Sequence, residues 1–216
     1  MKPEAFFFDL DGTLVDTERL WARAIVACMK DRGCEAEEDA TLNLILGHSW
    51  LDIHAKIHAA HPELGTTSAA EDAKALRAYY DRICTDPATT VIPSAVAFYR
   101  KAARIAPCAI VSGSPHPDVE AAARTCGIEL VTKFVLGAED YARGKPAPDG
   151  FLKAAAMLDV DASECVAVED SAAGIAAARA AGMRVIGVDR VGRGLAGCTW
   201  LVSDLSEIDP IAEFSE

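Results

Sequence analysis

The second part of the chain alternates short apolar runs with amphipathic segments. Runs that fit buried strands occur at residues 108–112, 164–168 and 184–188, with weaker ones at residues 133–136 and 199–202. Segments with helical periodicity separate them, at residues 93–103, 115–126, 149–158 and 171–181. Strands that alternate with helices predict right-handed crossovers and a doubly wound parallel sheet. We therefore expect an α/β fold for this part of the chain.

A further apolar run, at residues 6–8, stands near the start of the chain and ends abruptly in polar residues. It predicts a buried strand of the same sheet. The apolar patterns that follow are helical, with helices expected at residues 18–33, 37–46, 51–60 and 69–84. We therefore predict two domains, which are an α/β core (residues 1–16 and 91–216) and an inserted α-helical cap (residues 17–90).

Composition limits the kind of partner. The 216-residue chain has a net charge of -12, and its field therefore repels nucleic-acid phosphates and anionic membrane surfaces. We expect no nucleic-acid or membrane partner, and a monomer or a small homo-oligomer. Seven cysteines are scattered without a Cys-x-x-Cys pair, and no signal-peptide pattern precedes the first strand. Both features indicate reduced thiols in a cytoplasmic protein.

Two carboxylates follow the first apolar run. Asp9 and Asp11 are separated by one residue, so strand alternation turns both side chains to one side. They stand at the carboxyl end of a strand, where open parallel sheets bind ligands. Two acids this close repel each other unless a cation or a shared proton lies between them, which favours an ion such as Mg2+. The alternative is a buried strand that ends in a polar turn.

Other expected strands also end in residues that suit phosphate or metal. Ser112 and Gly113 lead from a strand into a helix, whose N-terminal amides favour an anion. Lys145 stands in a Gly-Lys-Pro-x-Pro-Asp loop that two prolines stiffen. Glu169 and Asp170 end the most apolar strand. Simpler explanations remain open, namely a helix cap at Ser112, a solvated lysine, and two acids that cap the next helix.

In order and spacing, these motifs resemble those of the haloacid dehalogenase superfamily, in the branch with a small helical cap that includes β-phosphoglucomutase-like and sugar phosphatase-like proteins. The match covers essentially the whole chain. The motifs that carry it are Asp9-x-Asp11-Gly-Thr-Leu-x-Asp-Thr, Ser112, Gly-Lys145-Pro-x-Pro-Asp and Glu169-Asp170-Ser. The resemblance implies a Rossmann-like core and a Mg2+-dependent phosphatase that acts on a small phosphorylated metabolite, such as a sugar or polyol phosphate.

The resemblance also implies roles for the matching residues. Asp9 is the expected nucleophile, which forms an aspartyl phosphate, and Asp11 is the expected general acid and base. Ser112, with Gly113, and Lys145 are expected to bind the transferring phosphoryl group. A carboxylate can attack phosphorus only if the negative charge of the phosphate is neutralised, which a lysine and a metal ion can do.

The same resemblance implies the metal ligands. Mg2+ is expected on the Asp9 carboxylate, the Asp11 backbone carbonyl and Asp170. Glu169 is expected nearby or bound to the ion through water.

Other activities of the superfamily are less compatible with the sequence. Asp11 argues against a dehalogenase, since halide leaves without protonation, and against phosphonatases, which replace this residue with a small one. The sugar-phosphate mutases carry a cap histidine shortly after the first motif, where Trp21 stands here. This difference favours a phosphatase, with a phosphomutase as the alternative. A catalytically silent phosphate-binding or partner-binding module is a third possibility, which the intact motifs disfavour.

Substrate specificity is expected to depend on the cap. His48, in a loop between two cap helices, and His116, after the second strand of the core, are candidate substrate-binding residues. His54, His58 and His61 have helical spacing, but no carboxylate at a matching spacing completes a metal site. We therefore expect these three histidines to lie on a solvated helix face.

Overall fold

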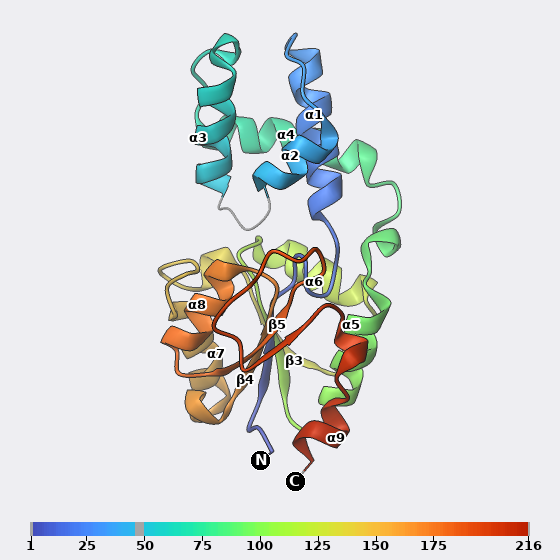
Figure 1. Ribbon diagram of the computed structural model, residues 1–216, viewed down its shortest axis with the longest axis vertical. Coiled ribbons are helices and arrows are strands. Elements are labelled where there is room, and N and C mark those ends of the chain that lie inside the picture. The colour runs from blue at the N-terminus through green and yellow to red at the C-terminus, as the bar shows by residue number, and fades with distance from the viewer. Residues whose placement is uncertain (1, 46–49, 216) are drawn as a thin grey trace. The chain divides into compact units, whose positions relative to one another are not determined.

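The computed structural model describes residues 2–45 and 50–215, and the chain divides into two compact units. The core unit comprises residues 1–16 and 88–216, and the helical unit comprises residues 17–87. Figure 1 shows the strands gathered in the core unit, together with both ends of the chain.

Within the described residues, a parallel sheet of six strands forms the centre of the core unit, in the order β3-β2-β1-β4-β5-β6. Phe7 in the central strand pairs with Ala109 on one side and Ala167 on the other. The doubly wound α/β fold expected from the sequence is therefore confirmed. The strands are β1 (Phe6–Phe8), β2 (Cys108–Val111), β3 (Thr132–Leu136), β4 (Val166–Glu169), β5 (Arg184–Val188) and β6 (Trp200–Val202).

Helices cover both faces of this sheet, with α5 and α9 on one side and α7 and α8 on the other (Figure 1). Phe6 and Phe8 pack on the α5 face together with α6, whereas Phe7 packs on the α7 face. Successive strand residues point to opposite faces, so a strand buried on both sides needs an apolar residue at every position. The helices are α5 (Pro93–Ala102), α6 (His116–Thr125), α7 (Asp149–Leu158), α8 (Ala172–Ala180) and α9 (Pro210–Phe214).

Polar residues stand at the carboxyl ends of four neighbouring strands. Asp9 follows β1, Ser112 follows β2, Glu169 is the last residue of β4, and Asp189 follows β5. Parallel strands place their carboxyl ends at one edge of the sheet. The topology therefore gathers these side chains, although they are far apart in the sequence.

The helical unit has a hydrophobic core of its own, to which each of its helices contributes, with Ile25, Ile45, Ile53 and Leu76 among the buried residues. Its last helix begins with a reciprocal capping box between Ser68 and Glu71. The helices in its described part are α1 (Glu18–Asp31), α2 (Glu38–Ile45), α3 (Trp50–Ala60) and α4 (Ala69–Ile83), with a 3-10 turn at Pro62–Leu64. The expected helices are confirmed.

The prediction of a solvated histidine face is wrong for His54 and His58. Each side chain is only 16% exposed, and their Nε2 atoms lie 3.3 and 2.7 Å from Asp72 Oδ2. Thr67 and Arg32 also donate hydrogen bonds to the Asp72 carboxylate, at 2.8 Å each. The carboxylate belongs to α4, so helical spacing within α3 could not reveal it.

The cysteines behave as small apolar residues. All seven are free thiols, and most are buried. Burial raises the pKa of Cys126 and of Cys165 to about 11, which keeps both protonated near neutral pH. No helix in the described ranges is both long and apolar enough to cross a membrane.

We expect Asp72→Ala to lower the free energy of unfolding by about 3 kcal/mol at pH 7, because it leaves Arg32 and His58 without their buried partner. Urea unfolding followed by tryptophan fluorescence measures this loss. Asp81→Ala is the matched control, since Asp81 pairs with Arg77 on the same helix and is 57% exposed. The control should cost less than about 0.5 kcal/mol, and equal losses in the two variants would contradict the prediction.

The cost of Asp72→Ala should also depend on pH. Burial acts to raise the pKa of Asp72, but hydrogen bonds from His58, Thr67 and Arg32 outweigh it and lower this pKa to about 2. A carboxyl whose pKa is lowered on folding stabilises the protein above its unfolded-state pKa, and that stability is lost as the pH falls through the native pKa. The difference between wild type and variant should therefore shrink from about pH 4 towards pH 2.

Candidate active site

The buried ammonium of Lys145 lies between two carboxylates at the strand ends. Its Nζ is 2.5 Å from Asp9 Oδ1 and 2.5 Å from Glu169 Oε1, and it donates to the Val111 carbonyl at 3.0 Å. It also lies 5.3 Å from the centre of the Phe151 ring. The Lys145 side chain is 13% exposed and Glu169 is fully buried. The structure therefore excludes the simpler explanation of a solvated surface lysine.

Burial changes the protonation of the acids around this lysine. Desolvation raises the pKa of Asp9 to about 7, and the neighbouring acids add to the rise while Lys145 opposes it. Desolvation also raises the pKa of Glu169, and it raises that of Asp170 to about 6 against the effect of Arg193. Burial disfavours the charged form of Lys145, but Asp9 and Glu169 outweigh it and raise the pKa of the ammonium. The group thus holds more acids than its own cations neutralise.

Asp9, Glu169 and Asp170 could together hold a metal ion. All three side chains are buried, and one carboxylate oxygen from each lies within 4.8 Å of the others. A donor set of carboxylate oxygens suits a hard cation such as Mg2+. A bound cation would also favour the charged forms of these acids, against the burial and the mutual repulsion that raise their pKa values. The residues present therefore fit the divalent ion expected from the sequence.

Two glycines let the backbone approach the acids. Gly12 has a φ of +83°, and a Cβ at this position would lie 2.3 Å from Asp170 Oδ2. A Cβ at Gly174, in the first turn of α8, would lie 2.0 Å from the Glu169 carboxylate. Neither position has room for a side chain, and the backbone of Gly12 is also unfavourable for other residues. The turn after β1 and the start of α8 therefore both fit closely around these carboxylates.

Asp11 contacts the loop that follows β2. Ser114 Oγ donates to Asp11 Oδ2 at 2.6 Å, and Ser112 Oγ donates to the same oxygen at 3.4 Å. Ser112 Oγ also accepts the backbone N–H of Ser114 at 3.0 Å, so Ser112 both caps the loop and faces Asp11. A Cβ at Gly113 would have no atom within 4 Å apart from those of the adjacent residues, so there is open space beside the loop. Ser114 was not among the site residues expected from the sequence, although it directly follows Ser112 and Gly113.

Arg193 is a second residue that the sequence did not indicate. One guanidinium nitrogen donates to the Asp170 carbonyl at 2.7 Å and to Asp170 Oδ2 at 3.0 Å. Asp189 fixes the loop around it by accepting the backbone N–H groups of Arg193 and Gly194, at 2.7 and 2.8 Å. No motif surrounds Arg193, so only the fold connects it with Asp170.

The described contacts of His116 are not with Asp9 or Lys145. Its Nδ1 lies 2.5 Å from Asp140 Oδ2, and its backbone N–H donates to Glu139 at 3.0 Å. The hydrogen bond with Asp140 raises the pKa of His116. These contacts fix the start of α6 to the 3-10 turn at residues 138–140. His48, the other candidate for substrate binding, lies outside the described residues.

Known proteins are similar to this chain over most of its length. A family model described as haloacid dehalogenase-like hydrolase matches residues 3–182. Hexitol phosphatase A of Escherichia coli is 33% identical over 190 residues, which cover 88% of this chain and 84% of that protein. Fructose-1-phosphate phosphatase YqaB of Escherichia coli is 31% identical over 183 residues, which cover 84% of this chain and 94% of that protein.

Solved structures share the fold. The crystal structure of β-phosphoglucomutase from Clostridium difficile matches with a TM-score of 0.79 at 23% identity, and the match covers 96% of this chain and 93% of that one. At this identity the similarity shows the fold alone. The family model and the hexitol phosphatase match, by contrast, rest on sequence and span most of the chain. The protein therefore belongs to the haloacid dehalogenase-like hydrolase family.

Proposed function

We propose that the protein is a Mg2+-dependent phosphatase that hydrolyses a sugar or polyol phosphate through an aspartyl phosphate on Asp9. The observation that carries this proposal is the buried Lys145 ammonium, 2.5 Å from both Asp9 and Glu169. A carboxylate nucleophile needs such a cation beside it, because the phosphate that it attacks is itself an anion. The two relatives are named for hexitol phosphate and fructose 1-phosphate hydrolysis, which supports the substrate class.

In the first step, a carboxylate oxygen of Asp9 forms a bond to phosphorus while the bond from phosphorus to the alcohol oxygen breaks. Asp11 gives its proton to the departing alkoxide. Lys145, Ser112 and the open backbone at Gly113 bind the phosphoryl oxygens.

In the second step, Asp11 takes a proton from water, and the water oxygen attacks phosphorus. The bond between phosphorus and the Asp9 oxygen breaks, which releases inorganic phosphate and restores the carboxylate. The hydrogen bond from Ser114 Oγ to Asp11 Oδ2 positions the acid for both proton transfers.

Asp9, Asp170 and the Asp11 backbone carbonyl would hold the Mg2+, with Glu169 nearby. When bound, the ion neutralises part of the negative charge of the phosphate. Arg193 positions Asp170 through its hydrogen bonds to the carboxylate and the carbonyl of that residue. Gly12 keeps space open for the Asp170 carboxylate.

The proposal also assigns roles beyond the core unit. The helical unit acts as a cap that helps to select the substrate, with His48 as a candidate contact. His116, which belongs to the core unit, is the second candidate contact. We place the reaction in the cytoplasm, which agrees with seven free thiols. The net charge of -12 agrees with a small metabolite rather than nucleic acid or a membrane surface as partner.

A phosphomutase is the second candidate, since the fold is shared with β-phosphoglucomutase. A mutase must keep its aspartyl phosphate until a sugar hydroxyl arrives, and the mutases that this chain resembles use a cap histidine for this purpose. Trp21 stands at that position. Its indole N–H can donate a hydrogen bond, but the ring cannot accept or relay a proton. The Trp21 ring stacks on Tyr80 within the helical unit, with 4.3 Å between ring centres. Trp21 therefore serves packing rather than proton relay.

Phosphorus NMR separates the two activities. With Mg2+ and a panel of hexitol phosphates, fructose 1-phosphate and β-glucose 1-phosphate, we expect inorganic phosphate to appear in step with substrate loss. No isomeric sugar phosphate should accumulate, because Asp11 activates water freely. Glucose 6-phosphate formed faster than inorganic phosphate would identify a mutase. No turnover of any member of the panel would favour a phosphate-binding module.

Asp9→Asn should reduce turnover by at least about 1,000-fold, because the amide keeps the shape of the side chain but is no nucleophile. Phosphate release at saturating substrate measures the loss, and far-ultraviolet circular dichroism should be unchanged. Asp159→Asn is the control, at an exposed residue in a left-handed conformation that asparagine also adopts. Turnover by Asp9→Asn above the level that deamidation explains would contradict the covalent mechanism.

Asp170→Ala should raise the Mg2+ concentration needed for half-maximal activity by about 10- to 100-fold, because it removes a metal ligand and leaves the nucleophile in place. Activity measured over a Mg2+ titration checks this, with Asp159→Asn again as the control. The same Mg2+ dependence in Asp170→Ala and wild type would show that Asp170 is no ligand.

A further inference from the structure

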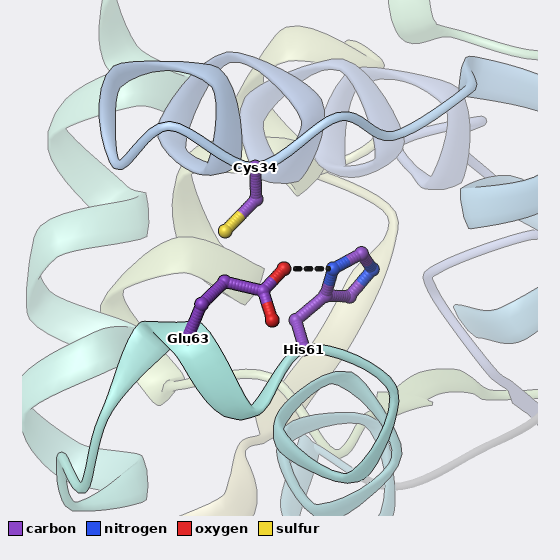
Figure 2. A group of neighbouring side chains, drawn as sticks. All are labelled: Cys34, His61 and Glu63. Carbon is purple, nitrogen blue, oxygen red and sulfur yellow. Dashed lines mark hydrogen bonds and ion pairs between the residues drawn. The ribbon is translucent and has the colours of Figure 1, made fainter.

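Three side chains of different chemistry meet within the helical unit, outside the residues proposed for phosphate hydrolysis. Figure 2 shows the Glu63 carboxylate between the sulfur of Cys34 and the ring of His61. One potential ligand atom from each residue lies within 4.8 Å of the others. His61 Nδ1 is 3.0 Å from Glu63 Oε1. Burial and the nearby Glu63 carboxylate raise the pKa of the Cys34 thiol.

We propose that Cys34, His61 and Glu63 bind a Zn2+ ion, which joins the loop after α1 to the turn after α3. Thiolate, imidazole and carboxylate are the ligands that Zn2+ uses in proteins, and three of them leave a fourth position for water. On binding, the Cys34 thiol releases its proton to solvent, and His61 presents the lone pair of one ring nitrogen. The hydrogen bond between His61 and Glu63 is thereby replaced by bonds to the metal.

Charge and exposure both suit a divalent ion at this place. The Cys34 thiolate and the Glu63 carboxylate carry two negative charges and a neutral imidazole carries none, so Zn2+ makes the site neutral. The thiolate selects Zn2+ over Mg2+, which prefers oxygen ligands. Cys34 is 3% exposed, whereas the Glu63 side chain is 55% exposed. The ion can therefore enter from solvent on the Glu63 side while the sulfur stays protected.

The backbone holds both ligand-bearing segments in place. Gly33 adopts a φ of +81° after α1, and the next residue, Cys34, donates its N–H to the Met29 carbonyl at 2.9 Å. His61 precedes the 3-10 turn at Pro62–Leu64, and its carbonyl accepts the N–H of Leu64 at 3.1 Å. The donor atoms are thus positioned before any metal binds, which reduces the entropy lost on binding.

His54, His58 and Asp72 form a second group with the right ligand types, but this group already contains a cation. Arg32 lies 2.8 Å from Asp72 Oδ1, and Thr67 donates to Oδ2 of the same carboxylate. With neutral imidazoles, a divalent ion beside Arg32 would leave a net positive charge that no nearby acid of the group offsets. We therefore assign the metal to Cys34, His61 and Glu63, and the second group provides a control.

The test uses the full chain and two metals. Protein purified without chelator is expected to contain about one zinc per chain. After removal of the zinc, titration with Co2+ should produce a thiolate-to-cobalt charge-transfer absorption. Cys34→Ser should abolish this absorption, and Glu63→Gln should weaken Zn2+ affinity by about 10-fold or more, measured against a competing chelator.

Three control variants should keep the absorption. Cys84→Ser removes a partly exposed thiol from the same unit, His58→Ala disrupts the second group, and Asp170→Ala disrupts the acids of the core unit. The proposal is overturned if wild type binds no stoichiometric zinc, if the absorption survives in Cys34→Ser, or if any control variant loses it. Should Cys34→Ser fail to fold, Glu63→Gln decides, because Glu63 is exposed and an unchanged affinity would also overturn the assignment.

Discussion

The core unit depends on one buried ammonium shared by two carboxylates. Lys145 lies 2.5 Å from both Asp9 and Glu169, and a charge buried this deeply costs several kcal/mol unless its partners stay in place. The sheet order supplies those partners, since β1 and β4 are neighbours and Asp9 and Glu169 stand at their ends. The ammonium that we propose to bind the phosphate is thus the same group that allows these two carboxylates to be buried.

The acidic groups of this protein differ in how far neighbouring side chains balance their negative charge. Asp72 is surrounded by Arg32, Thr67 and His58, so its charge is satisfied by the chain itself. In the part of the chain that the structure describes, Asp9, Glu169 and Asp170 pair with two cations, Lys145 and Arg193. Burial raises the pKa values of all three acids. Cys34 and Glu63 lie beside His61, whose ring is neutral when unprotonated. A group whose negative charges outnumber its own cations when its acids are ionised can gain by binding a cation from solution.

The sequence was sufficient for the architecture and for part of the candidate site. Three successive phenylalanines predict β1, because a central parallel strand is buried on both faces and leaves no polar position. Asp9 and Asp11 could be placed from the same pattern, since they follow that strand directly. Helical periodicity located α1 to α4 in the same way. It missed α9 (Pro210–Phe214), because five residues are too few to show a helical period.

Only the tertiary structure decided which side chains meet across elements. Periodicity tells which face of one helix a residue occupies, but not which residue of another helix lies opposite. For this reason the histidine face of α3 looked solvated in the sequence, whereas Asp72 covers part of it. The contacts of Arg193 with Asp170 and of Ser114 with Asp11 likewise depend on loops that the strand order brings together. Sequence patterns determine elements, and the packing of those elements determines the partners.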